Sequence, residues 1–250
     1  MGPWEDRDAV HAALVVAGKA HGMALVGGQH TEQMLGLLQA LDSCVKAGKI
    51  RFCGLSNETP WGISQYLKLS AQHNLPRMVS IQNEFGPLHT KDWPYLIEQC
   101  VHENIAYLPW SPLAGGFLTG KYRGGDDNNR ASKLGMLVHA EKSARETALL
   151  DTLLAVAAEL DASPTHVAIA WLLEKARRST TALIPILGSR SREQLDATLG
   201  ALSLALTAQQ VARLEAVSAV EAGVPHGTII GSAPRYSGVE TLDWPVVPVA

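Results

Sequence analysis

The residues best suited to bind a polar ligand stand at the ends of short apolar runs. Ser56 and Asn57 close one run, "IRFCGLSN", Gln82 closes "MVSIQ", and Trp110 closes "IAYLPW". Ser, Asn and Gln side chains provide both hydrogen-bond donors and acceptors, and an indole adds a wide face for stacking. Ser-Asn alone is also ordinary turn chemistry, but the recurrence of a polar side chain at Gln82 favours a binding role.

A Gly-rich segment follows Trp110 directly. It reads "SPLAGGFLTGKYRGG" and carries Lys121 and Arg123 near its end. Glycines let backbone N–H groups approach oxygen atoms closely, and Lys121 supplies positive charge. The segment therefore fits a ligand that presents oxygen atoms, with a plain Gly-rich surface loop as the alternative.

A second candidate anion site is the run "GSRSREQ", residues 188–194. Ser191 and Gln194 have the spacing of a capping box, which predicts the start of a helix. A helix N-terminus offers free N–H groups and the positive end of the helix dipole, and Arg190 adds a guanidinium fork for phosphate oxygens. The alternative is an ordinary capped helix with solvated arginines.

Strands alternating with helices must position these residues. The predicted strands are 50–57, 78–85, 105–110 and 181–187. Predicted helices run from about Thr31 to Gly48, from Thr59-Pro60, around 93–103, at roughly 141–160 and 164–177, after Ser191, and from Thr207 to about Ala219. The assignments follow helical apolar spacing, capping residues and helix-opening prolines.

Regular alternation predicts an α/β fold with parallel strands, either an open doubly wound sheet or part of a (β/α)8 barrel. A dinucleotide-binding doubly wound sheet should carry G-x-G-x-x-G after a strand, and none of the four strands is followed by it. Polar pairs instead follow the strands: Ser56-Asn57, Gln82-Asn83, Trp110-Ser111 and Gly188-Ser189. This favours a barrel, whose ligands bind at that rim.

The composition is that of an ordinary globular protein, with 250 residues, 46% hydrophobic, 18% charged and a net charge of −3. No broad basic field predicts nucleic-acid binding, and no run of about 18 apolar residues predicts a membrane span. Cys44, Cys53 and Cys100 lack metal-ligand or paired spacing and are expected to be reduced thiols. The acidic N-terminus is unlike a targeting segment, so a cytoplasmic location is expected.

Four motifs resemble the aldo-keto reductase superfamily. They are "GKIRFCGLSNETPWG", "VSIQNEFGPL", "WSPLAGGFLTGKY" and "IPILGSRSREQLDATLGAL", and the resemblance runs from about residue 31 to 219. It implies a (β/α)8 barrel that binds NADPH without a Rossmann domain and reduces aldehydes and ketones.

The resemblance also assigns cofactor-binding roles. Ser56, Asn57 and Gln82 match the residues that hydrogen-bond the nicotinamide carboxamide, and Trp110 stands where an aromatic residue, most often Tyr, stacks on the nicotinamide. The pyrophosphate segment would comprise Ser111, Pro112, Leu113, Gly115, Gly120 and Lys121. The 2′-phosphate and adenosine site would comprise Gly188, Ser189, Arg190, Ser191 and Gln194. Ala197 and Thr198 replace a common Glu-Asn pair, so weaker adenine contacts are expected.

The family's proton-transfer machinery has no match in this sequence. It uses an Asp and a Tyr in a D-x-x-x-x-Y-G-type motif, a Lys at a strand end, and a His after an apolar strand. Asp92 precedes Tyr95 by three residues and no Gly follows, and none of the nine histidines stands at such a strand end. We therefore expect no catalytic residue, and no carbonyl reduction by this chain alone.

These observations together predict an incomplete (β/α)8 TIM barrel, consisting of the last four strand–helix units plus a C-terminal helix. The half-barrel domain would span 31–222, between a poorly defined segment at 1–30 and a tail at 223–250. Half a barrel has open strand edges and an uncovered interior, so pairing with another barrel half is expected.

Three functional interpretations follow from the resemblance. The first is an NADP(H)-dependent oxidoreductase acting on a small carbonyl substrate once the barrel is completed. The second is a non-catalytic cofactor-binding or regulatory remnant, like the channel β-subunits of the superfamily. The third is a truncated, non-functional translation. The sequence leaves open whether Trp61, Phe85 and the tail contact the substrate, and it does not define the substrate.

Overall fold

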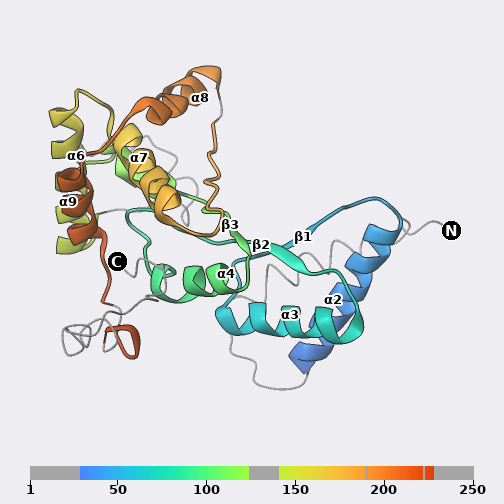
Figure 1. Ribbon diagram of the computed structural model, residues 1–250. Coiled ribbons are helices and arrows are strands. Elements are labelled where there is room, and N and C mark those ends of the chain that lie inside the picture. Colours follow the sequence, from blue (N-terminus) through green and yellow to red (C-terminus); the bar gives the residue numbers. More distant parts are fainter. Residues whose placement is uncertain (1–28, 124–140, 190, 222, 228–250) are drawn as a thin grey trace.

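The computed structural model describes residues 29–123, 141–189, 191–221 and 223–227 (Figure 1). Most of the predicted N-terminal segment and tail therefore lies outside the described residues. Within them the chain is an α/β structure with parallel strands, as the sequence predicts. Among these residues no single helix is long and apolar enough to cross a membrane. The helices α6 (Ala144–Glu159) and α7 (Pro164–Arg178) meet that criterion only together, across a 99° bend.

The first unit consists of α2 (Gln29–Lys46), β1 (Cys53–Ser56) and α3 (Pro60–His73). Thr59 caps α3, because its hydroxyl accepts a hydrogen bond from the Gly62 N–H at 3.1 Å, and Pro60 occupies the first turn, where no N–H is needed. Asn74 ends the helix in the left-handed conformation, with φ of 52°. The predicted start of this helix at Thr59 and Pro60 is therefore confirmed, whereas the sequence analysis named no residue for its end.

The next units contain β2 (Met78–Gln82), the π-helix η1 (Trp93–Ile97), α4 (Glu98–His102), β3 (Ala106–Tyr107) and the 3₁₀ segment η2 (Ala114–Thr119). The single helix predicted around 93–103 is thus split into two pieces. Pro94 has no N–H to donate, and the Ile97 N–H bonds to the Asp92 carbonyl, five residues back, at 3.1 Å.

The C-terminal part comprises α6 (Ala144–Glu159), α7 (Pro164–Arg178), α8 (Arg192–Leu199), the 3₁₀ turn η3 (Gly200–Ser203) and α9 (Ala208–Ser218). All four α-helices begin at a hydroxyl residue that accepts a backbone hydrogen bond: Ser143, Ser163, Ser191 and Thr207. Thr207 and Gln210 form the predicted reciprocal capping box.

Strand order in the sheet is β1-β2-β3, all parallel. The fourth predicted strand, 181–187, runs alongside β3 and forms one isolated parallel bridge, Tyr107 with Leu183. The Tyr107 N–H donates to the Ala182 carbonyl at 2.8 Å, and the Ile184 N–H donates to the Tyr107 carbonyl at 2.9 Å. Pro109 has no N–H for the next bond of this ladder, which explains why the fourth segment is extended without forming a full strand.

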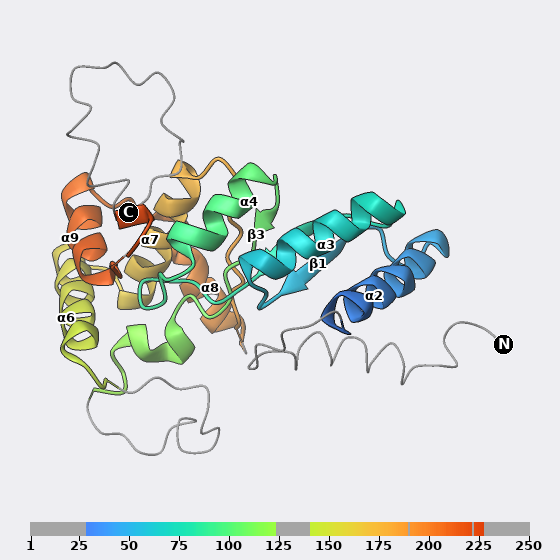
Figure 2. The same cartoon turned by 90° about the horizontal axis from the view of Figure 1, so that it is seen from below.

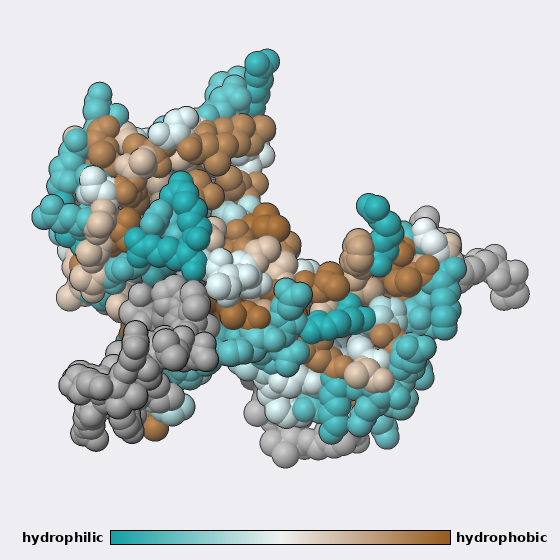
Figure 3. All heavy atoms as spheres, in the orientation of Figure 1, coloured by the Kyte–Doolittle hydropathy of each residue, from teal (hydrophilic) through white to brown (hydrophobic). Residues whose placement is uncertain are grey.

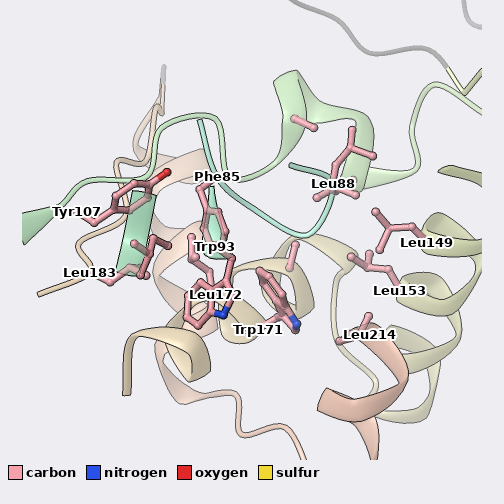
Figure 4. Close-up of a cluster of buried hydrophobic side chains, with 14 of the residues drawn as sticks. Phe85, Leu88, Trp93, Tyr107, Leu149, Leu153, Trp171, Leu172, Leu183 and Leu214 are labelled. Carbon is pink, nitrogen blue, oxygen red and sulfur yellow. The ribbon is translucent and has the colours of Figure 1, made fainter. Parts of the chain in front are cut away.

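One face of the sheet is covered by helices and holds the core. Leu55, Ile81, Tyr107 and Leu183 face that side, and Phe85 continues the row. Figure 4 shows Phe85, Tyr107 and Leu183 packed with two tryptophans from η1 and α7, with the Phe85 and Trp93 rings stacked 5.6 Å apart. Seen from below, α3 and α4 lie in front of the strands (Figure 2). Burial on this face is the main stabilising contribution of the fold.

Candidate functional site

The ends of β1, β2 and β3 bring together four of the predicted ligand-binding residues. The Asn57 N–H donates to the Gln82 carbonyl at 2.8 Å, and the Ser56 hydroxyl donates to the same carbonyl at 3.3 Å. The Trp110 indole N–H donates to Asn57 Oδ1 at 2.9 Å. Asn57 has φ of 51°, a left-handed conformation that Asn tolerates well. The indole is therefore tied to the end of β1, with Ser56 and Gln82 beside it.

Side-chain direction places these groups on one side of the sheet. Ser56 and Gln82 are register partners, so both side chains extend to the same face. Exposure alternates along β1, with Cys53 buried against the helices and Ser56 exposed. The candidate nicotinamide contacts therefore lie at the carboxyl ends of the strands, on the face that none of the described helices covers.

A buried polar network, which the sequence analysis missed, supports the rim from the helix-covered side. Asp92 Oδ2 accepts hydrogen bonds from the Tyr107 hydroxyl at 2.9 Å and from Asn83 Nδ2 at 3.0 Å. Asn83 also exchanges two hydrogen bonds with the Glu58 backbone, at 3.1 and 3.2 Å. The sequence feature that could have indicated this network is Asn83, a polar residue next to Gln82 at a strand end. The network fixes the loop after β1 to the loop after β2.

Burial dominates the electrostatics of this network. It raises the pKa of Asp92 above its ordinary value, and the hydrogen bonds from Asn83 and Tyr107 oppose the rise. Burial and the neighbouring Asp92 raise the pKa of Tyr107 strongly. Because the Tyr107 ring is fully buried and its hydroxyl is bonded to Asp92, it cannot give a proton to a ligand at the rim.

The segment after Trp110 folds into a tight loop held from inside by the buried side chains of Phe117 and Leu118. The Gly115 N–H donates to Ser111 Oγ at 3.1 Å. Five of its residues have positive φ: Ser111, Ala114, Gly115, Gly116 and Gly120. Lys121 is exposed, with its ammonium 4.9 Å from the centre of the Tyr122 ring. The N–H groups of Ala114, Gly115, Gly116 and Gly120 donate to oxygens within the loop itself, so the group that the loop offers to an anion is the Lys121 ammonium.

Gly86 positions the start of that loop. A Cβ atom on Gly86 would lie 2.7 Å from the Pro112 carbonyl oxygen and 3.1 Å from Pro112 Cα. The backbone of the loop after β2 therefore contacts the backbone of the predicted pyrophosphate segment. Leu113 belongs to the same segment. The sequence analysis did not single out Gly86, since nothing local marks a contact with a residue so far along the chain.

The third predicted group lies at and before α8. Ser191 caps this helix by accepting a hydrogen bond from the Gln194 N–H at 3.3 Å, and Gly188 and Ser189 precede it. Arg190 lies outside the described residues. Figure 1 shows α8 apart from β1 and β2, at the end of the extended segment that follows α7.

A cavity of about 770 Å³ opens beside Asn57 and Trp110. Its charged lining comprises Glu58, Glu84, His89, Lys91, Asp92, Arg145 and Glu146. His89 Nε2 lies 3.4 Å from Glu84 Oε1. The mixed charges suit a polar small molecule rather than a lipid or a nucleic acid. Among the described residues no group of three His, Cys, Asp or Glu side chains could hold a metal ion.

Comparison with known proteins identifies the family. The aldo/keto reductase family model matches residues 12–219. Protein tas of Escherichia coli is 34% identical over 193 residues, which cover 75% of this chain and 53% of that protein. Versiconal hemiacetal acetate reductase of Aspergillus parasiticus is 25% identical, covering 72% and 51%. An uncharacterized oxidoreductase of Mycobacterium bovis is 34% identical, covering 70% and 50%.

Among solved structures, a thermostable aldo-keto reductase in complex with the inhibitor epalrestat superposes with a TM-score of 0.54 at 19% identity. The superposition covers 74% of this chain and 54% of that one. This chain thus spans about half the length of the curated relatives it matches. The chain belongs to the aldo/keto reductase family.

Proposed function

We propose that this chain binds NADP(H) along the carboxyl ends of its strands and serves hydride transfer between the nicotinamide and an aldehyde or ketone. The observation that carries the proposal is the cluster of Ser56, Asn57, Gln82 and Trp110 at three strand ends. When bound, the dihydronicotinamide would supply the hydride. The protein's part is to hold the carboxamide, orient the ring and neutralise the phosphates.

The chemistry of these residues fits the nicotinamide end of the cofactor. The Trp110 N–H is already satisfied by Asn57, so the indole can offer its face without leaving a polar atom unpaired. The Gln82 side-chain amide has no hydrogen-bond partner within the described part of the chain. It therefore remains able to give a donor and an acceptor to a carboxamide.

The phosphate end of the cofactor would be held further along the chain. The loop from Ser111 to Gly120 would lie along the pyrophosphate, and the exposed ammonium of Lys121 would supply the positive charge. The N-terminus of α8, with Ser191 and Arg190, suits the 2′-phosphate that distinguishes NADPH from NADH.

We further propose that the sheet is half of a (β/α)8 barrel, containing the last four of its strand–helix units. The partial coverage of the relatives and the uncovered sheet face support this. No tyrosine of this chain is followed by Gly, and Tyr107 is buried, so the proton donor would come from elsewhere. The second candidate, cofactor binding without turnover, is favoured by the same observation.

Arg190 and Arg192 provide a direct test. Arg192 is 88% exposed and pairs only loosely with Asp196, at 3.5 Å, so it is a matched control on the same helix start. Losing a charge-assisted hydrogen bond costs about 1.5–3 kcal/mol, or roughly ten- to a hundredfold in affinity. Arg190→Ala should weaken NADPH binding by that factor and leave NADH unchanged, while Arg192→Ala changes neither. Equal losses for both cofactors in Arg190→Ala would overturn the assignment.

A further inference from the structure

The helix α8 has no buried side chain to fix its position. None of its eight residues is buried, and its two leucines, Leu195 and Leu199, are each 43% exposed. Figure 3 shows hydrophilic surface over the outer part of this helix. A helix without a buried apolar stripe gains little from packing, so the placement of α8 depends on the contacts at its ends.

The C-terminal end of α8 is tied to α7 by a side chain. His166 Nε2 donates a hydrogen bond to the Ala197 carbonyl, and because a carbonyl can only accept, this bond fixes a proton on Nε2. Ala197 lies in the last turn of α8, where carbonyls lack α-helical partners. The imidazole therefore acts as a C-terminal cap supplied by a neighbouring helix.

His166 extends to α8 from a part of the protein that the core fixes. It lies in the first turn of α7, and its backbone N–H donates to the capping hydroxyl of Ser163 at 3.2 Å. The next six residues of α7, from Val167 to Leu172, are all buried. The hydrogen bond to Ala197 thus joins an exposed helix to a firmly packed one.

Gly200, the residue that follows α8, makes room for the imidazole. A Cβ atom on Gly200 would lie 2.9 Å from both Cε1 and Nε2 of His166. The backbone of Gly200 is right-handed helical, with φ of −55° and ψ of −26°, so its conformation does not require glycine. The close approach of His166 is therefore the constraint at this position, and it is an observation independent of the hydrogen bond.

We propose that His166 is a positioning residue that orients α8, and through it the helix N-terminus that would hold the 2′-phosphate of NADP(H). The cofactor part of this inference rests on the proposed function, whereas the hold of His166 on α8 belongs to the chain without ligand. An eight-residue helix is about 12 Å long, so a rotation of about 15° about its last turn moves its first turn by roughly 3 Å. Such a shift would take Ser191 and the first N–H groups out of hydrogen-bond range of the phosphate.

Amide hydrogen exchange of the purified chain, measured without cofactor, tests the hold of His166 on α8. His166→Ala removes one hydrogen bond and should speed exchange in residues 192–199 roughly fivefold, with α6 and α9 unchanged. His166→Gln should restore the wild-type rate, because the amide Nε2 of Gln can donate to the same carbonyl. Thr165→Ala is the matched control on the preceding residue of α7 and should exchange as wild type does.

Gly200→Ala tests the same contact from the other side. The added Cβ should displace the imidazole and speed exchange in α8 by a similar factor. In the His166→Ala background the substitution should have no further effect, since the ring that it would displace is gone. Unchanged exchange in His166→Ala, or a Gly200→Ala effect that persists without the imidazole, would overturn the proposal.

Calorimetric titration with NADPH and with NADH tests the consequence for the cofactor. His166→Ala should lower the preference for NADPH over NADH by roughly two- to fivefold, and His166→Gln should restore it. An unchanged preference, while α8 exchanges faster, would overturn the positioning role. A wild-type chain that binds neither cofactor would contradict the proposed function and with it the cofactor role of His166, while faster exchange in His166→Ala would still support its hold on α8.

Discussion

The Trp110 indole nitrogen donates a hydrogen bond of 2.9 Å to Asn57 Oδ1, across 53 residues of sequence. The bond joins the end of β3 to the end of β1 and bridges over β2, which lies between them. It fixes the plane of the indole, because a ring held at one edge cannot turn about its χ2 axis without breaking the bond. The stacking surface is thus preorganised before any ligand arrives.

Substitutions at Trp110 separate the ring from the hydrogen bond. Trp110→Ala removes both and should weaken NADPH binding roughly tenfold or more, since aromatic stacking contributes about 0.5–1.5 kcal/mol beyond the buried area. Trp110→Phe keeps a ring and loses only the bond, so its loss should be smaller. Isothermal titration calorimetry is the suitable measurement, because both variants change the fluorescence signal.

Trp61 is the control for that pair. It lies on α3 and is 55% exposed, and its replacement by Ala should leave NADPH affinity within twofold of wild type. If Trp61→Ala and Trp110→Ala lost affinity equally, the nicotinamide would not be stacked on Trp110.

Gly86→Ala should disturb the loop that follows Trp110. The added Cβ would meet the Pro112 backbone at 2.7 Å, and a backbone neighbour cannot rotate away as a side chain can. Such overpacking costs about 1–3 kcal/mol of unfolding free energy, measured by urea denaturation, and NADPH binding should weaken in parallel.

Gly36→Ala is the opposite case. Gly36 lies within α2 with nothing within 4 Å of its Cβ position, so alanine should stabilise the protein by about 0.5–1 kcal/mol. A Gly86→Ala protein as stable as Gly36→Ala would show that the close approach to Pro112 is not a constraint.

Lys175 is a buried cation with a single close carboxylate. It is 5% exposed, its ammonium lies 2.6 Å from Glu215 Oε1, and the rings of Trp93 and Trp171 lie 4.6 and 5.5 Å away. Glu215→Ala leaves the charge unpaired and should cost about 3–5 kcal/mol of unfolding free energy. Lys175→Met should cost less, because Met fills the space and Arg178, 3.8 Å from Glu215, remains to pair with it. Equal costs in urea denaturation would contradict this ranking.

Asp92 should make stability depend on pH in an identifiable direction. Burial raises the pKa of Asp92 in the folded protein above the ordinary value of 3.8, so between these values the folded state binds more protons than the unfolded state. The contribution of Asp92 to the free energy of unfolding therefore falls as pH rises from 3.8 to the pKa of the folded protein. Above the folded pKa the buried carboxylate is charged and destabilises the folded state in full.

The comparison with Asp92→Asn isolates that contribution, because the variant cannot titrate. Urea denaturation from pH 7 down to pH 4 should show wild type gaining stability relative to Asp92→Asn. A difference that is constant across this range, or one that falls towards pH 4, would mean that the carboxylate is not desolvated as described.

Local signals in the sequence predicted the parts of the fold that depend on local chemistry. The caps at Thr59 and Thr207, the three short strands and the gathering of Ser56, Gln82 and Trp110 at their ends all follow from spacing and residue type. These features need only a strand to end and its neighbour to run parallel, so a single sequence carries enough information for them.

The features that escaped prediction depend on contacts between distant residues. No local sequence pattern predicts the Asp92–Tyr107 hydrogen bond or the close approach of Gly86 to Pro112. The π-turn at η1 arises because Pro94 removes a donor within a sequence that otherwise has helical spacing. Pro109 likewise interrupts the ladder to the fourth segment, although the apolar run "TALIPIL" reads as a full strand.

The most direct test of NADP(H) binding at these strand ends is a calorimetric titration of the purified 250-residue chain with NADPH, beside the Ser56→Ala/Gln82→Ala double variant. We expect saturable binding of one NADPH per chain by wild type and at least tenfold weaker binding by the double variant, with circular dichroism unchanged. Wild-type protein that is folded but shows no saturable NADPH binding would contradict the proposed function, as would a double variant that binds as tightly as wild type.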